Sequence, residues 1–305
     1  MKHAGTAALD RSRLFRPELA AQVRRIEVRT RRRVGAWACG RYESVFKGTG
    51  LEFEEVREYT PGDDVGAIDW KVSARSGRPY VKLYREEREI PIWLLLDLSA
   101  SSRFGSGASK LETMAEFAAL IGLAASHHGD RVGAVGFRDR IEGHVPPGRS
   151  PGHVWRILWQ LLGCAPRGTG TRLTTGLQFV DAVSRRRGIV FVVSDFLDEG
   201  YERALGRLAR RHDVVCVPVF DPADGHLPSA GLLCITDFET GEVRLVDARA
   251  RAVRGQYRDG RESERQRALS LFQRAGAATL PLSTVSEPGA ALERFFRERE
   301  HRGYR

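Results

Sequence analysis

Long apolar runs and cysteine pairs are what this sequence of 305 residues lacks. No apolar run approaches the roughly 20 residues that a membrane-spanning helix requires. The opening residues, MKHAGTAALDRSRLFRPEL, have no apolar core of the kind found in secretory signals. The four cysteines are widely scattered, without a Cys-x-x-Cys pair, which argues against a zinc knuckle or a disulfide framework and favours buried thiols. We therefore expect a cytoplasmic protein without a membrane span.

Lysine is scarce as well, because 44 of the 49 basic residues are arginine. The formal net charge is +10, and arginine pairs well with carboxylate or phosphate. This balance predicts an anionic partner, such as nucleic acid, an anionic membrane surface or an acidic protein. The arginines are spread along the chain among 39 acidic residues, which argues against one dedicated nucleic-acid stripe. Nucleic-acid binding stays open as an alternative.

Strands and helices are expected to alternate from residue 90 onward. Strands are predicted at 90–99, 131–137, 188–196, 212–220 and 277–282, a hairpin at 231–248, and helices at 110–128, 150–163, 172–186, 201–211, 249–276 and 287–300. The run GIVFVVSDF is continuously apolar, as is typical of a strand covered on both faces. The pattern predicts an α/β fold, a doubly wound and mostly parallel sheet with helices on both faces.

Two smaller segments precede this domain. Residues 17–33 predict an amphipathic helix with a basic face, which either packs by its apolar side or docks an anionic partner. Residues 41–89 read as strands of a small β subdomain, with TPGDD as a turn and Asp63 or Asp64 as the cap of a short helix. The expected boundaries are 1–40, 41–89, 90–285 for the large domain and 286–305 for a C-terminal helix.

Oxygen-bearing side chains follow the predicted strands at one edge of this sheet. Asp97, Ser99 and Ser101 come after the first strand, Thr171 lies in a glycine-rich loop before a helix, and Asp195 ends GIVFVVSD. Ligands bind at the carboxyl ends of strands in open parallel sheets, so we expect these three loops to meet. Two carboxylates and three hydroxyls make a hard oxygen site suited to Mg²⁺ or Mn²⁺. Taken singly, each group is equally suited to a helix cap or a loop hydrogen bond.

A catalytic interpretation is weaker. An aspartate after an apolar strand is where haloacid-dehalogenase-type phosphotransferases carry their nucleophile, but Ser99 stands where those enzymes need a second aspartate. No G-x-x-x-x-G-K-[ST] motif is present, so we expect no ATP hydrolysis by the chain itself. We expect a non-enzymatic protein, with a metal-dependent phosphotransferase as the less favoured alternative.

Two resemblances sharpen this prediction. Asp97-x-Ser99-x-Ser101, then Thr171 and Asp195, resembles the metal-ion-dependent adhesion site (MIDAS) of von Willebrand factor type A domains, over roughly residues 90–285. The block GTGLEFEEVREYTPGDDVGAIDWKVSAR is similar to the signature of the bacterial family known as domain of unknown function 58. Together they imply a metal-dependent protein-interaction adaptor that grips an acidic residue of its partner. The family resemblance further implies a MoxR-type AAA+ ATPase as that partner, in chaperone-like or complex-maturation work.

The signature block supplies a second set of candidates. Those for docking the ATPase are Arg57, Asp63, Asp69, Trp70, Lys71 and Arg75. The charged members are equally suited to joining the small sheet to the metal-binding domain through buried ion pairs. Gly66 stands where family members commonly carry arginine, which predicts one weakened contact.

Overall fold

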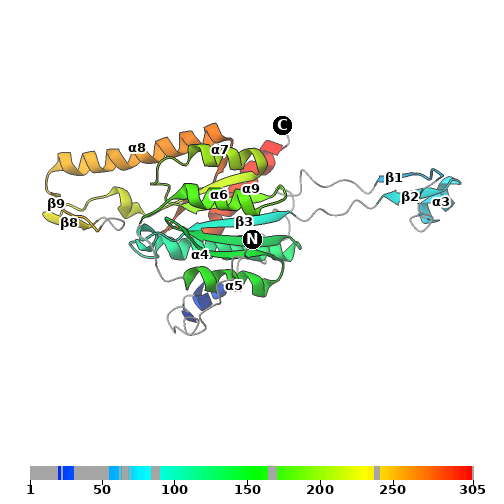
Figure 1. Ribbon diagram of the computed structural model, residues 1–305, viewed down its shortest axis with the longest axis horizontal. Coiled ribbons are helices and arrows are strands. Elements are labelled where there is room, and N and C mark those ends of the chain that lie inside the picture. Colours follow the sequence, from blue (N-terminus) through cyan, green and yellow to red (C-terminus); the bar gives the residue numbers. More distant parts are fainter. Residues whose placement is uncertain are drawn as a thin grey trace, which may run out of the picture.

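A seven-stranded sheet forms the centre of the molecule (Figure 1). The computed structural model describes residues 20–21, 23–30, 55–61, 63, 68, 70–83, 90–163, 170–236 and 241–303. The strand order is β10-β7-β6-β3-β4-β5, and β11 also pairs with β7. The strands are β3 (Pro91–Asp97), β4 (Arg131–Phe137), β5 (Ile141–Gly148), β6 (Ile189–Ser194), β7 (Asp213–Phe220), β10 (Ala278–Thr279) and β11 (Leu282–Ser283).

Every pairing in this sheet is parallel except that of β4 with β5. The central strand β6, with the sequence IVFVVS, is buried at every residue. Its β-branched and aromatic side chains suit a strand that is covered on both faces. The predicted doubly wound, mostly parallel α/β fold is confirmed.

Helices cover both faces of the sheet, and successive side chains of β3 point to opposite faces. Leu94 and Leu96 belong to one core, whereas Trp93 and Leu95 belong to the other. The first core includes side chains of α4 (Lys110–His127), α5 (Pro151–Leu162) and α9 (Pro288–Gly303). The second includes side chains of α6 (Leu173–Val183), α7 (Glu202–Arg211) and the C-terminal part of α8 (Arg251–Ala275). Helix α9, which the sequence analysis set apart from the large domain, therefore packs in the same core as α4.

The antiparallel edge strand β5 was not predicted. It carries Pro146 and Pro147, and most of its residues are only partly buried. Proline cannot donate to a sheet hydrogen bond and is tolerated chiefly on edge strands. Pro146 and Pro147 therefore explain why the sequence pattern does not predict this strand, and they are consistent with its position at the edge of the sheet.

The segment between β7 and β10 contains a hairpin and the long helix. Strands β8 (Leu232–Thr236) and β9 (Val243–Asp247) pair antiparallel, as predicted, and α8 follows and ends at Gly276, whose φ is 73°. Glycine adopts this left-handed conformation without strain. The expectation of buried thiols holds for Cys216 but is wrong for Cys234, which is exposed on β8. Cys39 and Cys164 lie outside the described residues.

The predicted basic helix near the N-terminus packs by its apolar side. Residues 23–30 are helical, and Ile26 is buried in the same core as α4. Arg25 and Arg29 face Glu112 and Glu116 of α4, at 3.8 and 3.6 Å between nitrogen and oxygen. The basic face of this helix thus complements an acidic face of α4.

A small unit precedes the sheet in the sequence, and Figure 1 draws it apart from the sheet. Strands β1 (Glu55–Glu58) and β2 (Tyr80–Leu83) pair antiparallel, with α3 (Trp70–Ser76) between them in the chain. Because α3 begins at Trp70, Asp63 is not its cap; its carboxylate instead accepts from the backbone N–H of Thr60. Asp64, the other candidate cap, and Gly66 lie outside the described residues. None of the helices described has both the length and the apolar character needed to cross a membrane.

Candidate metal centre

Asp97 and Asp195 follow two neighbouring parallel strands. Asp97 is the last residue of β3, and Asp195 comes directly after β6, which pairs with β3. The hydroxyl of Ser194, the last residue of β6, donates a 2.6 Å hydrogen bond to Asp97 Oδ2. The ends of the two strands are therefore joined directly, and both carboxylates lie at the carboxyl edge of the sheet.

Asp97 is held in an environment that disfavours its charge. Burial and then the negative charge of Asp195 raise the pKa of the Asp97 carboxyl to about 7. The hydrogen bonds from Ser194 and from the backbone N–H of Ser99 oppose this rise but do not overcome it. Two neighbouring carboxylates of this kind favour a cation between or beside them.

Residues 99–102, which we call the serine loop, present hydroxyls next to Asp97. Ser99 is 1% exposed, and its Oγ lies 2.9 Å from Oγ of Ser101. Ser102 faces a different way, because its hydroxyl donates to the carbonyl of Ser99 at 2.7 Å. Two hydroxyls are thus directed at each other, while the third fixes the loop.

The Thr171 loop is held between the two neighbouring loops of the same edge. The N–H of Arg172 donates to the carbonyl of Arg138 just after β4, at 3.0 Å. The N–H of Leu173 donates to Oδ2 of Asp198, in the loop after β6, at 2.7 Å. Thr171 itself is partly buried. Backbone N–H groups next to Thr171 therefore join its loop to the loops after β4 and β6, at the same edge of the sheet as Asp97 and Asp195.

Asp195 is bound less firmly than Asp97. Its Oδ1 accepts from the N–H of Leu197 at 3.4 Å, and its Oδ2 lies 3.4 Å from Nζ of Lys110. Both distances exceed the usual range of about 2.7–3.2 Å for such bonds. Its neighbour Phe196 has a φ of 56°, rare for a residue other than glycine, and its ring packs against Phe272. The carboxylate of Asp195 thus keeps capacity for a further ligand.

Lys110 is the charged residue of this edge that sequence reasoning missed. Its side chain is 2% exposed, and Nζ lies 2.9 Å from Asp224 as well as near Asp195. It begins α4, directly after the N-cap Ser109. One signal was available, because lysine is rare in this arginine-rich chain, but its burial depends on contacts across 85 and 114 residues of sequence.

The oxygen donors fit a hard divalent cation. Two carboxylates and nearby hydroxyls are the donor types that Mg²⁺ and Mn²⁺ accept. Among the residues described, no cluster of three or more histidine, cysteine or acidic side chains forms an alternative metal site. A site with two acidic residues and several hydroxyls is of a different composition.

The signature-block candidates lie on the small unit. Arg57 Nη2 and Asp63 Oδ1 form a 2.7 Å ion pair within the block. The hydrogen bond from Arg57, and next that from the N–H of Thr60, lower the pKa of Asp63 to about 2. Trp70 is 70% exposed, and Lys71 and Arg75 are exposed beside it on α3. Asp69 lies outside the described residues.

Comparison with known proteins gives one family and several structural likenesses. Residues 55–267 match the model of a family described as "Protein of unknown function DUF58". Uncharacterized protein Rv1480 of Mycobacterium tuberculosis (strain ATCC 25618 / H37Rv) is 32% identical over 287 residues, covering 93% of this chain and 90% of that protein. Uncharacterized protein Mb1516 of Mycobacterium bovis matches to the same extent. The family match spans the small unit formed by β1, α3 and β2, which we call the signature unit. It also spans most of the sheet, including the candidate metal centre.

Among solved structures, similar folds occur at low sequence identity. BatB from Bacteroides thetaiotaomicron is 14% identical, with a TM-score of 0.44, covering 70% of this chain and 99% of that one. The SpRpn10 VWA domain is 11% identical, with a TM-score of 0.37, covering 68% of this chain and 95% of that one.

Proposed function

This chain belongs to the DUF58 family of proteins of unknown function, and on that premise we propose that it is a non-catalytic, divalent-metal-dependent adaptor for protein interaction. Asp97, Ser99, Ser101, Thr171 and Asp195 would hold Mg²⁺ or Mn²⁺. The bound ion would supply a positive, electrophilic position for a carboxylate of the partner. The proposed partner is a MoxR-type AAA+ ATPase, in chaperone-like or complex-maturation work.

The observation that carries this proposal is the unfavourable charge at the carboxyl edge. Asp97 is buried beside Asp195, and the resulting rise of its pKa means that the ionised form of Asp97 is disfavoured as it stands. A divalent cation would offset that cost, and hydroxyls of the serine loop lie next to the carboxylates. Perturbed carboxylates of this kind concentrate at functional sites.

The first test compares binding of a purified MoxR-type ATPase from the same organism in Mg²⁺ and in EDTA. We expect binding in Mg²⁺, and its loss both in EDTA and in the Asp97→Ala variant. The matched control is Asp139→Ala, which removes a carboxylate paired with Arg140 in the loop after β4. Wild-type affinity in Asp97→Ala, or equal loss in both variants, would overturn the proposal.

Nucleic-acid binding is the second candidate, and the net charge of +10 favours it. Binding through arginine and phosphate falls steeply with salt and does not depend on a divalent ion. RNA or DNA should therefore be quantified in the same experiment. Retention that persists in EDTA but disappears with added salt would support this candidate over the adaptor.

A further inference from the structure

Helix α8 carries a regular series of arginines. They recur at spacings of three and four residues, at Arg251, Arg254, Arg258, Arg261 and Arg265. Side chains at these spacings share one face of a helix. The same face continues at Ala268 and Phe272, and Phe272 is fully buried in the core. The helix face that anchors α8 to the sheet therefore becomes basic toward its N-terminal end. We call Arg258, Arg261 and Arg265 the arginine stripe.

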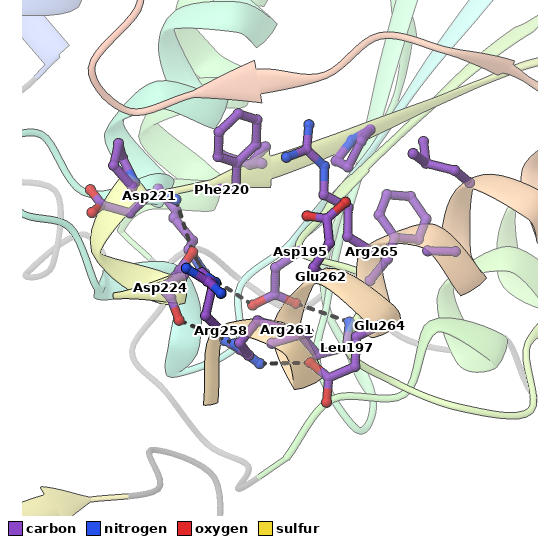
Figure 2. A pocket seen from close by; sticks show the side chains of 18 of the residues that line it. Asp195, Leu197, Phe220, Asp221, Asp224, Arg258, Arg261, Glu262, Glu264 and Arg265 are labelled. Carbon is purple, nitrogen blue, oxygen red and sulfur yellow. Dashed lines mark hydrogen bonds and ion pairs between the residues drawn. The ribbon is translucent and has the colours of Figure 1, made fainter. Parts of the chain in front are cut away.

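The arginine stripe lines a cavity beside the candidate metal centre. The cavity has a volume of about 260 Å³ and lies between α8, the end of β7 and the 3-10 turn η4 (Pro222–Gly225). Apolar side chains form much of its wall, namely Phe196, Leu197, Pro218, Val219, Phe220, Pro222, Leu269 and Phe272. Lys110 and Asp195 also line it, and Figure 2 shows the Asp195 side chain together with those of the arginine stripe. The cavity and the metal centre therefore share Asp195.

Several acidic side chains of the cavity already have partners within the protein. Asp221 accepts hydrogen bonds from Ser106 and Thr284. Asp224 pairs with Lys110, and Glu264 pairs with Arg261 at 3.1 Å. Internal donors or cations therefore partly offset the negative charge of these three carboxylates.

Arg265 differs from Arg261, which pairs with Glu264, because its guanidinium packs on an aromatic ring instead. Its guanidinium carbon lies 4.8 Å from the centre of the Phe220 ring, and the side chain is exposed. Among the residues described, it has no hydrogen-bonding or ion-pairing partner beyond this stacking contact. A stacked guanidinium keeps its planar N–H groups available for a carboxylate. It is therefore oriented by the ring and ready to bind an anion at the cavity.

We infer that this cavity docks an acidic peptide segment of the partner, with one apolar side chain in the cavity and a carboxylate on Arg265. The inference rests on the proposed function, because Asp195 would bring the metal-bound carboxylate of the same segment beside the cavity. The cavity volume lies below the roughly 300–1,000 Å³ of small-molecule sites, which suits a side chain better than a cofactor. The cavity lining carries four basic and five acidic side chains, and the divalent ion of the proposed function, bound beside them at Asp195, would turn this balance positive. The metal-loaded cavity would then complement an acidic segment.

The test measures fluorescence polarisation of a labelled synthetic peptide in which a Leu–Phe pair is flanked by Asp and Glu residues, in the presence of Mg²⁺. Two comparison peptides replace the Leu–Phe pair by serines, or the acidic flanks by lysines. We expect the first peptide to bind most tightly. Equal binding of the serine peptide would overturn the apolar part of the inference, and equal binding of the lysine peptide would overturn its acidic part.

Arg265→Glu is the decisive variant, and Arg267→Glu is its matched control. Both reverse the charge of an exposed arginine on the same helix, but Arg267 is not among the residues that line this cavity. We expect Arg265→Glu to weaken peptide binding about tenfold, with little effect of Arg267→Glu. Equal weakening would indicate that only net charge matters, and would overturn the inference.

Direct titration of Mn²⁺ by electron paramagnetic resonance separates the two proposals. We expect Arg265→Glu to bind Mn²⁺ as the wild type does, because Arg265 is not a proposed ligand. Mn²⁺ binding without peptide binding would overturn the inference and leave the metal centre standing. Peptide binding without Mn²⁺ binding would overturn the proposed metal centre. The cavity would then be a docking site that acts without a metal.

Discussion

Two aspartates in different regions of this protein respond to their surroundings in opposite ways. At the carboxyl edge of the sheet, Asp97 is 1% exposed, and burial beside Asp195 raises its pKa to about 7. In the signature unit, Asp63 pairs with Arg57 at the surface, and its pKa falls to about 2. The side chain is the same, so the difference comes from solvent and partners alone.

The difference indicates where each region is poised to bind. The Arg57–Asp63 pair is satisfied within its own block, so it offers little driving force for a partner. At the carboxyl edge, burial beside Asp195 disfavours the ionised form of Asp97, and a further cation there would offset this cost. If the signature unit docks a protein, the exposed indole of Trp70 is better suited to the task than that ion pair.

Of the variants considered, Lys110→Met should lower the free energy of unfolding the most, because it destabilises the carboxyl edge of the sheet. The variant leaves Asp195 and Asp224 without their buried ammonium, which costs about 3–5 kcal/mol of unfolding free energy when one partner of a buried pair is removed. In a domain of this size that is a fall in Tm of roughly 6–20 °C, measurable by calorimetry.

The control for this variant is Lys71→Met, on the exposed surface of α3, which should change Tm little. Mg²⁺ should stabilise Lys110→Met more than it stabilises the wild type, because Asp195 then lacks its internal cation. A Tm equal to that of the control would show that Lys110 makes no net contribution to the edge.

Ser101→Ala should have a smaller effect, on metal affinity and not on the fold. Removing one hydroxyl ligand should weaken Mn²⁺ binding about tenfold, as measured by paramagnetic resonance titration. Ser102→Ala is the matched control, since this neighbouring hydroxyl donates to the Ser99 carbonyl instead. Loss of affinity in Ser102→Ala alone would mean that the loop, and not the Ser101 hydroxyl, determines binding.

The sheet was predictable from the sequence because its signals are local. The runs that form β3 and β6 are continuously apolar up to their last residue, and β4 combines apolar residues with glycine. The order of strands then places the ends of these runs at one edge. Strand β5 was missed because its two prolines are tolerated only through its edge position, which is a tertiary property. The exposure of Cys234 was missed for a similar reason, because among the described residues β8 pairs with β9 alone, outside the main sheet.

The candidate site also contains residues that the sequence predicts and residues that only the tertiary structure reveals. Asp97, Ser99, Ser101, Thr171 and Asp195 could be named because each follows a predictable strand or precedes a predictable helix. Lys110 and the arginine stripe could not, since their roles depend on how α4 and α8 approach the ends of β6 and β7. Long-range packing of charged side chains leaves no short motif in the sequence.

The titration of Asp63 should show the smallest effect of these predictions. It tests why the pKa of Asp63 is lowered whereas that of Asp97 is raised. Because the pKa of Asp63 in the folded state is depressed from 3.8 to about 2, its pair with Arg57 contributes stability above the ordinary pKa, and that contribution is lost as the pH falls through about 2. A side-chain carboxyl resonance followed by NMR should report this midpoint, and Arg57→Gln should move it toward the ordinary value. If the midpoint stays near 2 in Arg57→Gln, the N–H of Thr60 and not the guanidinium holds the carboxylate. Asp63 would then act as a cap of the turn at Thr60, independently of Arg57.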